Sequence, residues 1–159
     1  MFGIEPDPIY EFGLLLHTTD VLSLDDDVLK RLKDEFHFID IDDDPYLVTL
    51  ELSKCEKIVS SSLHGLIVSE AMGIPTCYLG TYIRENDFKV HDYYLGTNRK
   101  IEDIKKYHLK CGQTIDKTNL SFTKPGKFDI GGFLNSAPFE LSNEVSSEKI
   151  KSYYGDLIF

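Results

Sequence analysis

The 159-residue chain contains no tryptophan, only three cysteines, and no apolar run that approaches the ~20 residues of a membrane-spanning helix. Its first ten residues, MFGIEPDPIY, have neither a basic start nor a long apolar stretch, so they lack the features of a secretory signal. These absences predict a cytoplasmic protein without a membrane span. The hydrophobic fraction of 42% is sufficient for the core of one domain.

The cysteines are too few and too scattered for a disulfide framework or a zinc site. They are odd in number and form no CxxC pair, which zinc sites commonly contain. We therefore expect buried, reduced thiols at all three positions. These positions are Cys55, Cys77 and Cys111.

One acidic stretch has part of the spacing of a calcium-binding loop. Positions 1, 3, 5 and 12 of such a loop are occupied by Asp40, Asp42, Asp44 and Glu51. Pro45 stands where the loop requires a glycine, and a strand is expected before it instead of a helix. We therefore expect no metal site, and interpret the stretch as a surface turn that caps the next helix.

Basic residues are in the minority, with 17 lysines and arginines against 27 acidic residues and a net charge of −10. This balance argues against general binding to nucleic acid or to an anionic membrane. Basic residues gather between positions 84 and 100, where a small anion can still bind if local groups outweigh the overall field. A solvated loop of mixed charge explains the same residues equally well. The basic residues considered for binding are Arg84, Lys89 and His91.

Short apolar runs alternate with helical patterns along the first part of the chain. Apolar strands that alternate with helices are typical of a parallel sheet covered by helices, so we expect an α/β, Rossmann-like domain. The expected strands are 12–17, 36–41, 58–62 and 75–80, and the expected helices are 23–36 (capped by Ser23), 46–57, 63–72 and 98–110. We expect one domain over residues 1–159, with its α/β core at 12–111 and a polar surface excursion and closing helix at 112–159.

The most informative stretch is IVSSSLHG, where an apolar strand runs into three serines at the start of a helix. A helix N-terminus offers backbone N–H groups and partial positive charge, which suit a phosphate or a carboxylate. Ser60, Ser61 and Ser62 add hydroxyl donors beside the backbone turn at Leu63. This combination predicts a binding site for a small anion at the end of the strand.

Two residues of the first helical turn extend this prediction. His64 can bind an anion or move a proton, and Gly65 leaves room for a ligand against the backbone. A simpler interpretation, in which Ser62 only caps the helix and His64 lies on the surface, explains the pattern about as well. His17 ends the first strand in the same way, so it is a second site candidate, or else a buried structural histidine.

Four segments resemble the polysaccharide pyruvyl transferase family, and they occur in the family's order. SSSLHGLIVSEAMGIP (60–75) resembles the family's signature segment, and LLLHTTD (14–20) resembles its histidine-containing segment at the end of an earlier strand. FKVHDYYLG (88–96) resembles the segment after the signature helix, and FDIGGFLNSAPF (128–139) resembles the closing pattern.

The resemblance implies two Rossmann-like domains that face each other across a cleft, as in GT-B glycosyltransferases, with this chain as the C-terminal half. It also implies transfer of pyruvate from phosphoenolpyruvate, as donor substrate and without a cofactor, to a sugar of a surface glycan as a cyclic ketal. The partners are then an anionic donor and a glycan acceptor. The expected N-terminal half-domain is absent from this sequence, so the chain is a fragment, a remnant, or one half of an assembly with another chain.

The same resemblance implies roles for the residues of the signature segment. His64 matches the motif histidine, which is expected to act as acid or base or to contact the donor. The serines and the helix N-terminus are expected to hold phosphate or carboxylate. Many members have an arginine two residues before the histidine, where this chain has Ser62. An arginine makes a bidentate contact with a carboxylate that a serine cannot replace.

Two other functions stay open at this stage. A glycosyltransferase or sugar-nucleotide enzyme of the GT-B type would use the same helix N-terminus to bind a nucleotide diphosphate. An inactive binding or interaction module is the third interpretation, because a cleft with one wall need not retain catalysis.

Overall fold

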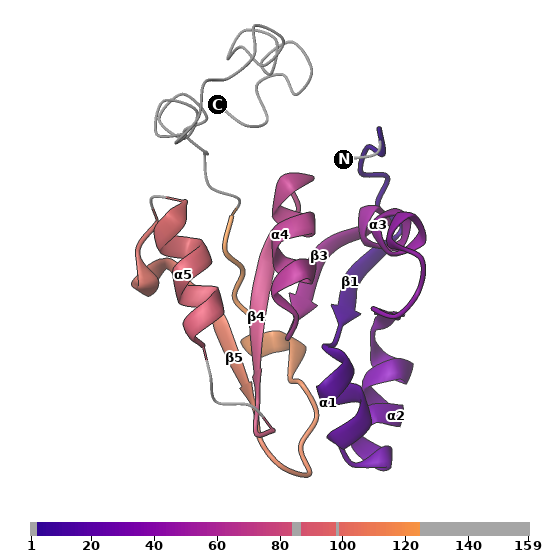
Figure 1. The fold of residues 1–159 in the computed structure, drawn as a ribbon. Coiled ribbons are helices and arrows are strands. Elements are labelled where there is room, and N and C mark those ends of the chain that lie inside the picture. Colours follow the sequence, from indigo (N-terminus) through magenta and orange to yellow (C-terminus); the bar gives the residue numbers. More distant parts are fainter. Residues whose placement is uncertain (1–2, 84–86, 98, 125–159) are drawn as a thin grey trace, which may run out of the picture.

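The computed structural model describes residues 3–83, 87–97 and 99–124. They form a five-stranded, all-parallel sheet with the strand order β2-β1-β3-β4-β5 (Figure 1). The strands are β1 (Tyr10–Leu15), β2 (His37–Ile39), β3 (Cys55–Ser60), β4 (Thr76–Thr81) and β5 (Lys106–Leu109). The expected α/β, Rossmann-like class is therefore confirmed. The facing domain of a GT-B arrangement and the extent of the domain stay predictions.

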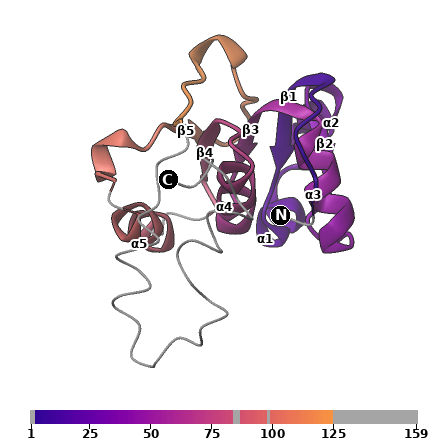
Figure 2. The ribbon, with the colours of Figure 1, turned by 90° about the horizontal axis from the view of Figure 1, so that it is seen from above.

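Helices lie on both faces of the sheet, as the view from above shows (Figure 2). Helix α1 (Thr18–Ser23) leads from β1 into α2 (Asp26–Glu35), which covers one face. Helices α3 (Pro45–Ser53), α4 (Leu63–Ala71) and α5 (Phe88–Gly96) cover the other face. Two short 3-10 helices, η1 (Ile101–Asp103) and η2 (Lys117–Asn119), lie outside the sheet. In the described part of the chain, no helix has the length and apolar character needed to cross a membrane.

The alternation of side chains along the strands builds a core on each face. Leu14 and Leu16 pack into the core under α2, whereas Leu15 between them packs into the core under α3 and α4. A third cluster, under α4 and α5, contains Leu66 and Tyr94, both 0% exposed. The sheet is thus apolar on both sides, as expected for parallel strands covered by helices.

The helix predicted over residues 98–110 is wrong. This segment forms η1 and then β5, which adds a fifth strand beside β4. Tyr107 and Leu109 pack against the core under α2, while His108 between them is exposed. The segment therefore has the period-2 pattern of an edge strand with one buried face.

The helix predicted over residues 23–36 is wrong at its start, because two helices occupy this part of the chain. Ser23 is the last residue of α1 instead of an N-cap, and α2 begins at Asp26. His17 caps α1, since its Nδ1 accepts the Thr19 N–H at 3.1 Å. A helix as short as α1 depends on such capping and on tertiary contacts for its stability.

The segment after β4 also differs from the prediction of a basic loop. Lys89 and His91 lie on α5, and Arg84 lies outside the described residues. The predictions for the closing segment at 128–139 and for a C-terminal helix lie outside them as well. Helix α3 begins close to the predicted start, and the Asp44 carboxylate accepts the Tyr46 N–H at 2.9 Å. The predicted end at residue 57 is wrong, because α3 ends at Ser53 and residues 55–57 belong to β3.

The cysteine prediction is correct at two of three positions. Cys55 and Cys77 are free, buried thiols, and burial raises the pKa of each to about 12. Cys111 is exposed, contrary to the prediction. It follows β5 and Lys110, at the rim of the sheet and not inside it.

Candidate functional site

The strand order places a topological switch point between β1 and β3. The chain moves from β1 outward to β2, then returns past β1 to β3 and continues outward to β4 and β5. In open parallel sheets, ligands bind at the carboxyl ends of the strands where this direction reverses. His17 follows β1 and the serine turn follows β3, so both predicted site segments meet at this point.

Two of the three serine hydroxyls are used to hold the strand ends together. The Ser60 Oγ donates to the Leu15 carbonyl oxygen at 2.8 Å and accepts the Ser62 N–H at 3.0 Å. The Ser61 Oγ donates to the Asp20 Oδ2 at 2.6 Å and accepts the His17 N–H at 3.0 Å. These bonds join the ends of β1 and β3, so both serines position the site. Ser60 is 0% exposed and, contrary to the prediction, does not line the compartment described below, whereas Ser61 does.

Asp20 extends this connection to the next strand. Its side chain is 0% exposed, and its Oδ1 accepts the Thr81 hydroxyl at 2.7 Å. The carboxylate therefore links α1 with the ends of β3 and β4. Sequence reasoning missed this residue, although an aspartate three positions after a strand-end histidine is a detectable signal.

Ser62 differs from the other two serines. It is the N-cap residue of α4, but its side chain makes no capping hydrogen bond. The residue is 1% exposed, and its Oγ has no hydrogen-bond partner among the described residues. Because a buried hydroxyl without a partner costs roughly 1–3 kcal/mol, this group is the unusual feature of the turn.

A compartment of about 120 Å³ opens at this turn, and we refer to it as the anion compartment. The first backbone N–H groups of α4 have no acceptor within the helix, and the helix dipole makes this end partly positive. Lys89 adds a full positive charge from the first turn of α5. The lining residues are His17, Ser61, Ser62, Leu63, His64, Tyr78, Lys89 and Val90.

The two histidines enter the anion compartment from different strand ends. The His64 residue is exposed in the first turn of α4, so it is not a core residue. His17 is half-buried, and its Nδ1 accepts the Thr19 N–H. A neutral His17 ring bonded in this way carries its proton on Nε2.

Other predicted site residues have different positions. Gly65 is buried, and a Cβ at this position would overlap the Ser60 hydroxyl and lie 3.0 Å from the Leu15 Cδ2. The missing side chain thus lets α4 approach the strands closely, and the space that we expected for a ligand is filled by protein. His91 is not among the residues that line the anion compartment.

Tyr78 is a wall residue that the sequence did not indicate. Its hydroxyl donates to the Asp87 Oδ1 at 2.9 Å. Burial raises the pKa of Asp87, but hydrogen bonds from Lys106 and Tyr78 outweigh that effect and hold the pKa below its usual value. Asp87 is therefore the ionised anchor between β4, β5 and the start of α5.

A second polar hollow, of about 520 Å³, lies at the ends of β4 and β5. Its Lys106 already forms an ion pair with Asp87, so much of its positive charge is neutralised within the protein. The described residues contain no group of three or more histidine, cysteine or acidic side chains placed to hold a metal ion. The anion compartment is thus the better candidate for a negatively charged ligand.

Comparisons with known proteins match the part of the chain that contains the serine turn. Residues 4–81 match the family model described as "Polysaccharide pyruvyl transferase". A curated relative, "Uncharacterized protein L143" of Acanthamoeba polyphaga mimivirus, is 33% identical over 127 residues, which is 77% of this chain and 42% of the relative. The chain thus spans less than half the length of that relative. No solved structure matches. The matched segment, which contains β1 to β4 and the serine turn, is thus similar to the polysaccharide pyruvyl transferase family, as the sequence resemblance predicted.

Proposed function

We propose that this chain carries the donor-binding half of a pyruvyl transferase, in which the first turn of α4 binds phosphoenolpyruvate. The observation that carries the proposal is the buried Ser62 hydroxyl, which has no partner among the described residues and belongs to a residue that lines the compartment with His17, His64 and Lys89. An anionic oxygen would accept hydrogen bonds from this hydroxyl and from the free amides, and so offset the cost of burying them.

The expected reaction forms a cyclic ketal from the enol carbon of phosphoenolpyruvate and two hydroxyls of a sugar. An acid protonates the methylene carbon, the first hydroxyl adds to the adjacent carbon, and the second hydroxyl replaces the phosphate. One hydroxyl proton replaces the proton given to the methylene, and the other leaves with the phosphate. His64 is suited to be the acid and base, since it is exposed at the compartment and imidazole exchanges protons near neutral pH.

The other residues of the compartment would stabilise negative charge. As the carbon–oxygen bond to phosphate breaks, charge grows on the leaving phosphate oxygens. This negative charge would be stabilised by the α4 amides, the Ser62 hydroxyl and the Lys89 ammonium. The Ser62 hydroxyl can donate one hydrogen bond, whereas an arginine would donate two and add a positive charge. We therefore expect weaker binding of the donor than in family members that have the arginine.

The size of the compartment favours a compact donor over a sugar nucleotide. Its volume of about 120 Å³ lies well below the ~300–1,000 Å³ of pockets that enclose larger ligands. A phosphate or carboxylate group fits this volume, while a nucleotide would extend far beyond it.

The proposal is tested by incubating the chain with phosphoenolpyruvate and a methyl galactoside or mannoside, with release of inorganic phosphate as the readout. We expect acceptor-dependent release that His64→Ala abolishes. His108→Ala is the matched control, because His108 is exposed on β5 and lies outside the anion compartment. Release that survives His64→Ala would contradict the role of His64.

Binding measured without an acceptor separates the alternatives. We expect phosphoenolpyruvate to raise the melting temperature, and a sugar nucleotide to have little effect. Stabilisation by the sugar nucleotide alone would favour a glycosyltransferase. No response to either compound would favour an interaction module without this site.

A further inference from the structure

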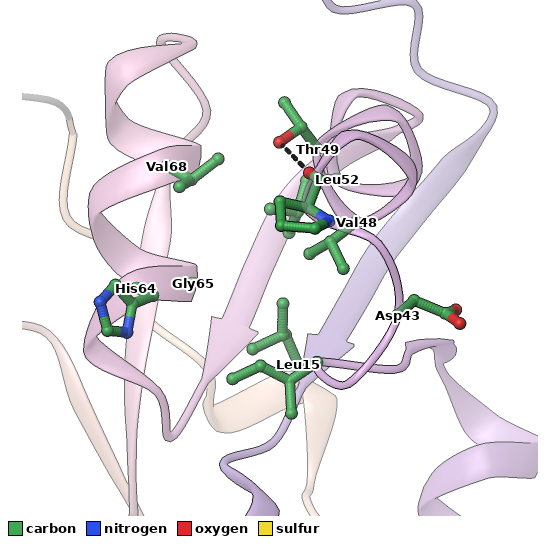
Figure 3. Close-up of a pocket in the computed structure, with 10 residues that line it drawn as sticks. Leu15, Asp43, Val48, Thr49, Leu52, His64, Gly65 and Val68 are labelled. Atoms are coloured by element: carbon green, nitrogen blue, oxygen red, sulfur yellow. Dashed lines mark hydrogen bonds between the residues drawn. The ribbon is translucent and has the colours of Figure 1, made fainter.

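A second cavity, of about 360 Å³, lies next to the anion compartment between α3 and α4 (Figure 3). Leu15 at the end of β1 lies between the two helices at one end of this cavity, which we call the apolar cavity. The cavity therefore lies at the same switch point of the sheet. Its lining residues are Leu15, Ile41, Asp43, Pro45, Val48, Thr49, Leu52, His64, Gly65 and Val68.

The two cavities share His64. The residue lines both the anion compartment and the apolar cavity. In the close-up view, Val68 points from α4 toward the opposite helix, which carries Val48 and Leu52, and the His64 ring lies at the outer side of α4 (Figure 3). A ligand that occupies the apolar cavity would thus approach the group that we expect to protonate the donor.

The apolar cavity offers few hydrogen bonds to a ligand. The Thr49 hydroxyl already donates to the Pro45 carbonyl oxygen at 2.7 Å. The ionisable side chains on the wall are Asp43, in the loop before α3, and His64, at the start of α4. A sugar without an apolar substituent would lose hydrogen bonds to water here and form few new ones. Transfer of an apolar group from water into the cavity is favourable.

We propose that the apolar cavity binds an apolar aglycone attached to the acceptor sugar, so that the sugar hydroxyls lie at its rim beside His64. The identity of this ligand as an acceptor rests on the proposed function, while the presence of the subsite does not. The substrate class is then a glycoside with a compact alkyl or aryl group, and not a free sugar.

The test compares the binding of phenyl β-galactoside and methyl β-galactoside to the chain by calorimetry, without phosphoenolpyruvate. We expect the phenyl glycoside to bind about tenfold more tightly, because its ring is removed from water. Equal affinity for the two glycosides would overturn the proposal.

Two variants locate the preference in the structure. Val68→Phe fills the apolar cavity and should remove the preference for phenyl. Ala71→Phe places the same side chain at an exposed position of α4 and should leave the preference unchanged. Thermal unfolding of both variants shows that they fold, and the wild-type comparison does not depend on either. A preference that persists in folded Val68→Phe would contradict the assignment to this cavity.

Binding of phosphoenolpyruvate is measured separately, so the two proposals can fail independently. If the chain binds phenyl β-galactoside more tightly than methyl β-galactoside, and Val68→Phe removes this difference, the subsite is supported even if phosphoenolpyruvate does not bind. Transfer of pyruvate to both glycosides with equal KM would contradict the subsite while supporting the proposed reaction.

Discussion

At the scale of single residues, the Ser62 hydroxyl is the group that separates a ligand site from an ordinary helix cap. An ordinary cap would bond to the first turn of α4, and this one does not. We expect Ser62→Ala to raise the free energy of unfolding by roughly 1–2 kcal/mol, because it removes a buried hydroxyl without a partner. The same change should weaken binding of phosphoenolpyruvate by about tenfold.

The matched control for this prediction is Ser69→Ala on the same helix. The Ser69 hydroxyl donates to the Gly65 carbonyl oxygen at 2.7 Å, so its removal should lower stability and leave binding unchanged. Urea unfolding and calorimetry measure the two effects. A Ser62→Ala variant that is less stable and binds normally would mean that Ser62 is a structural cap.

Gly65 tests how closely α4 must approach the sheet. A Cβ at this position overlaps the Ser60 hydroxyl, and Ser60 also holds the Leu15 carbonyl oxygen. We expect Gly65→Ala to lower the free energy of unfolding by roughly 1–3 kcal/mol through overpacking. Gly96→Ala is the control, since a Cβ there has no neighbour within 4 Å. Equal stability of the two variants in urea would contradict the close packing.

Single residues also show how far the sequence can predict a site. The positions of His17 and His64 at adjacent strand ends follow from the alternation of strands and helices, because parallel strands end at one edge. The sequence pattern does not predict that the Ser60 and Ser61 hydroxyls donate to Leu15 and Asp20. These hydrogen bonds join segments more than 40 positions apart. Three neighbouring serines read alike in the sequence but differ in the fold.

At the scale of elements, a buried ion pair joins α4 to the end of α5. The Glu70 Oε2 lies 2.8 Å from the Arg99 Nη2 and also accepts the Tyr93 hydroxyl at 2.9 Å. Its Oε1 accepts the hydroxyls of Thr76 and Tyr94. Burial lowers the pKa of Arg99, but the hydrogen bond and charge of Glu70 outweigh this effect and raise it. The pair thus holds α4, α5 and β4 together.

We expect Arg99→Met to lower the free energy of unfolding by roughly 3–5 kcal/mol, because Glu70 is left charged and buried without its cation. The double variant with Glu70→Gln should recover part of the loss. Lys57→Met, which removes an ion pair with Glu11 at the surface, should have a much smaller effect. Urea unfolding measures all three, and similar losses in Arg99→Met and Lys57→Met would contradict a buried pair.

The Asp87 anchor makes the junction of β4, β5 and α5 sensitive to acid. Its pKa is lower in the folded protein than its ordinary value, so its contribution is present above about pH 4. That contribution disappears as the pH falls through the folded-state pKa. We expect Asp87→Asn to destabilise the protein at pH 7 and to differ less from wild type at pH 2.5. A difference that is the same at both pH values in urea unfolding would contradict this assignment.

The elements differ in how well the sequence predicts them. The strand β4 and the helix α4 were placed correctly because their apolar runs end at clear turn residues. The strand β5 was predicted as a helix, since its lysines and its short length hide the alternation of Tyr107 and Leu109. Helix α1 is too short to have a periodic pattern, and its buried Asp20 accepts hydrogen bonds from Ser61, just after β3, and from Thr81 on β4.

At the scale of the whole molecule, the strand order determines where the two cavities lie. Both open where the chain reverses direction between β1 and β3, and His64 belongs to both. This arrangement provides one polar and one apolar compartment that share the residue His64. It is consistent with bringing an anionic donor and a glycoside together, which is the core of our proposal.

The most direct test of this account is a titration of ¹⁵N-labelled chain with phosphoenolpyruvate, followed by amide chemical shifts. The account predicts saturable shifts centred on the amides of Leu63, His64 and Gly65, and competition by inorganic phosphate. Shifts that are absent from this turn, or that centre on Lys106 and His108 in the neighbouring hollow, would contradict it.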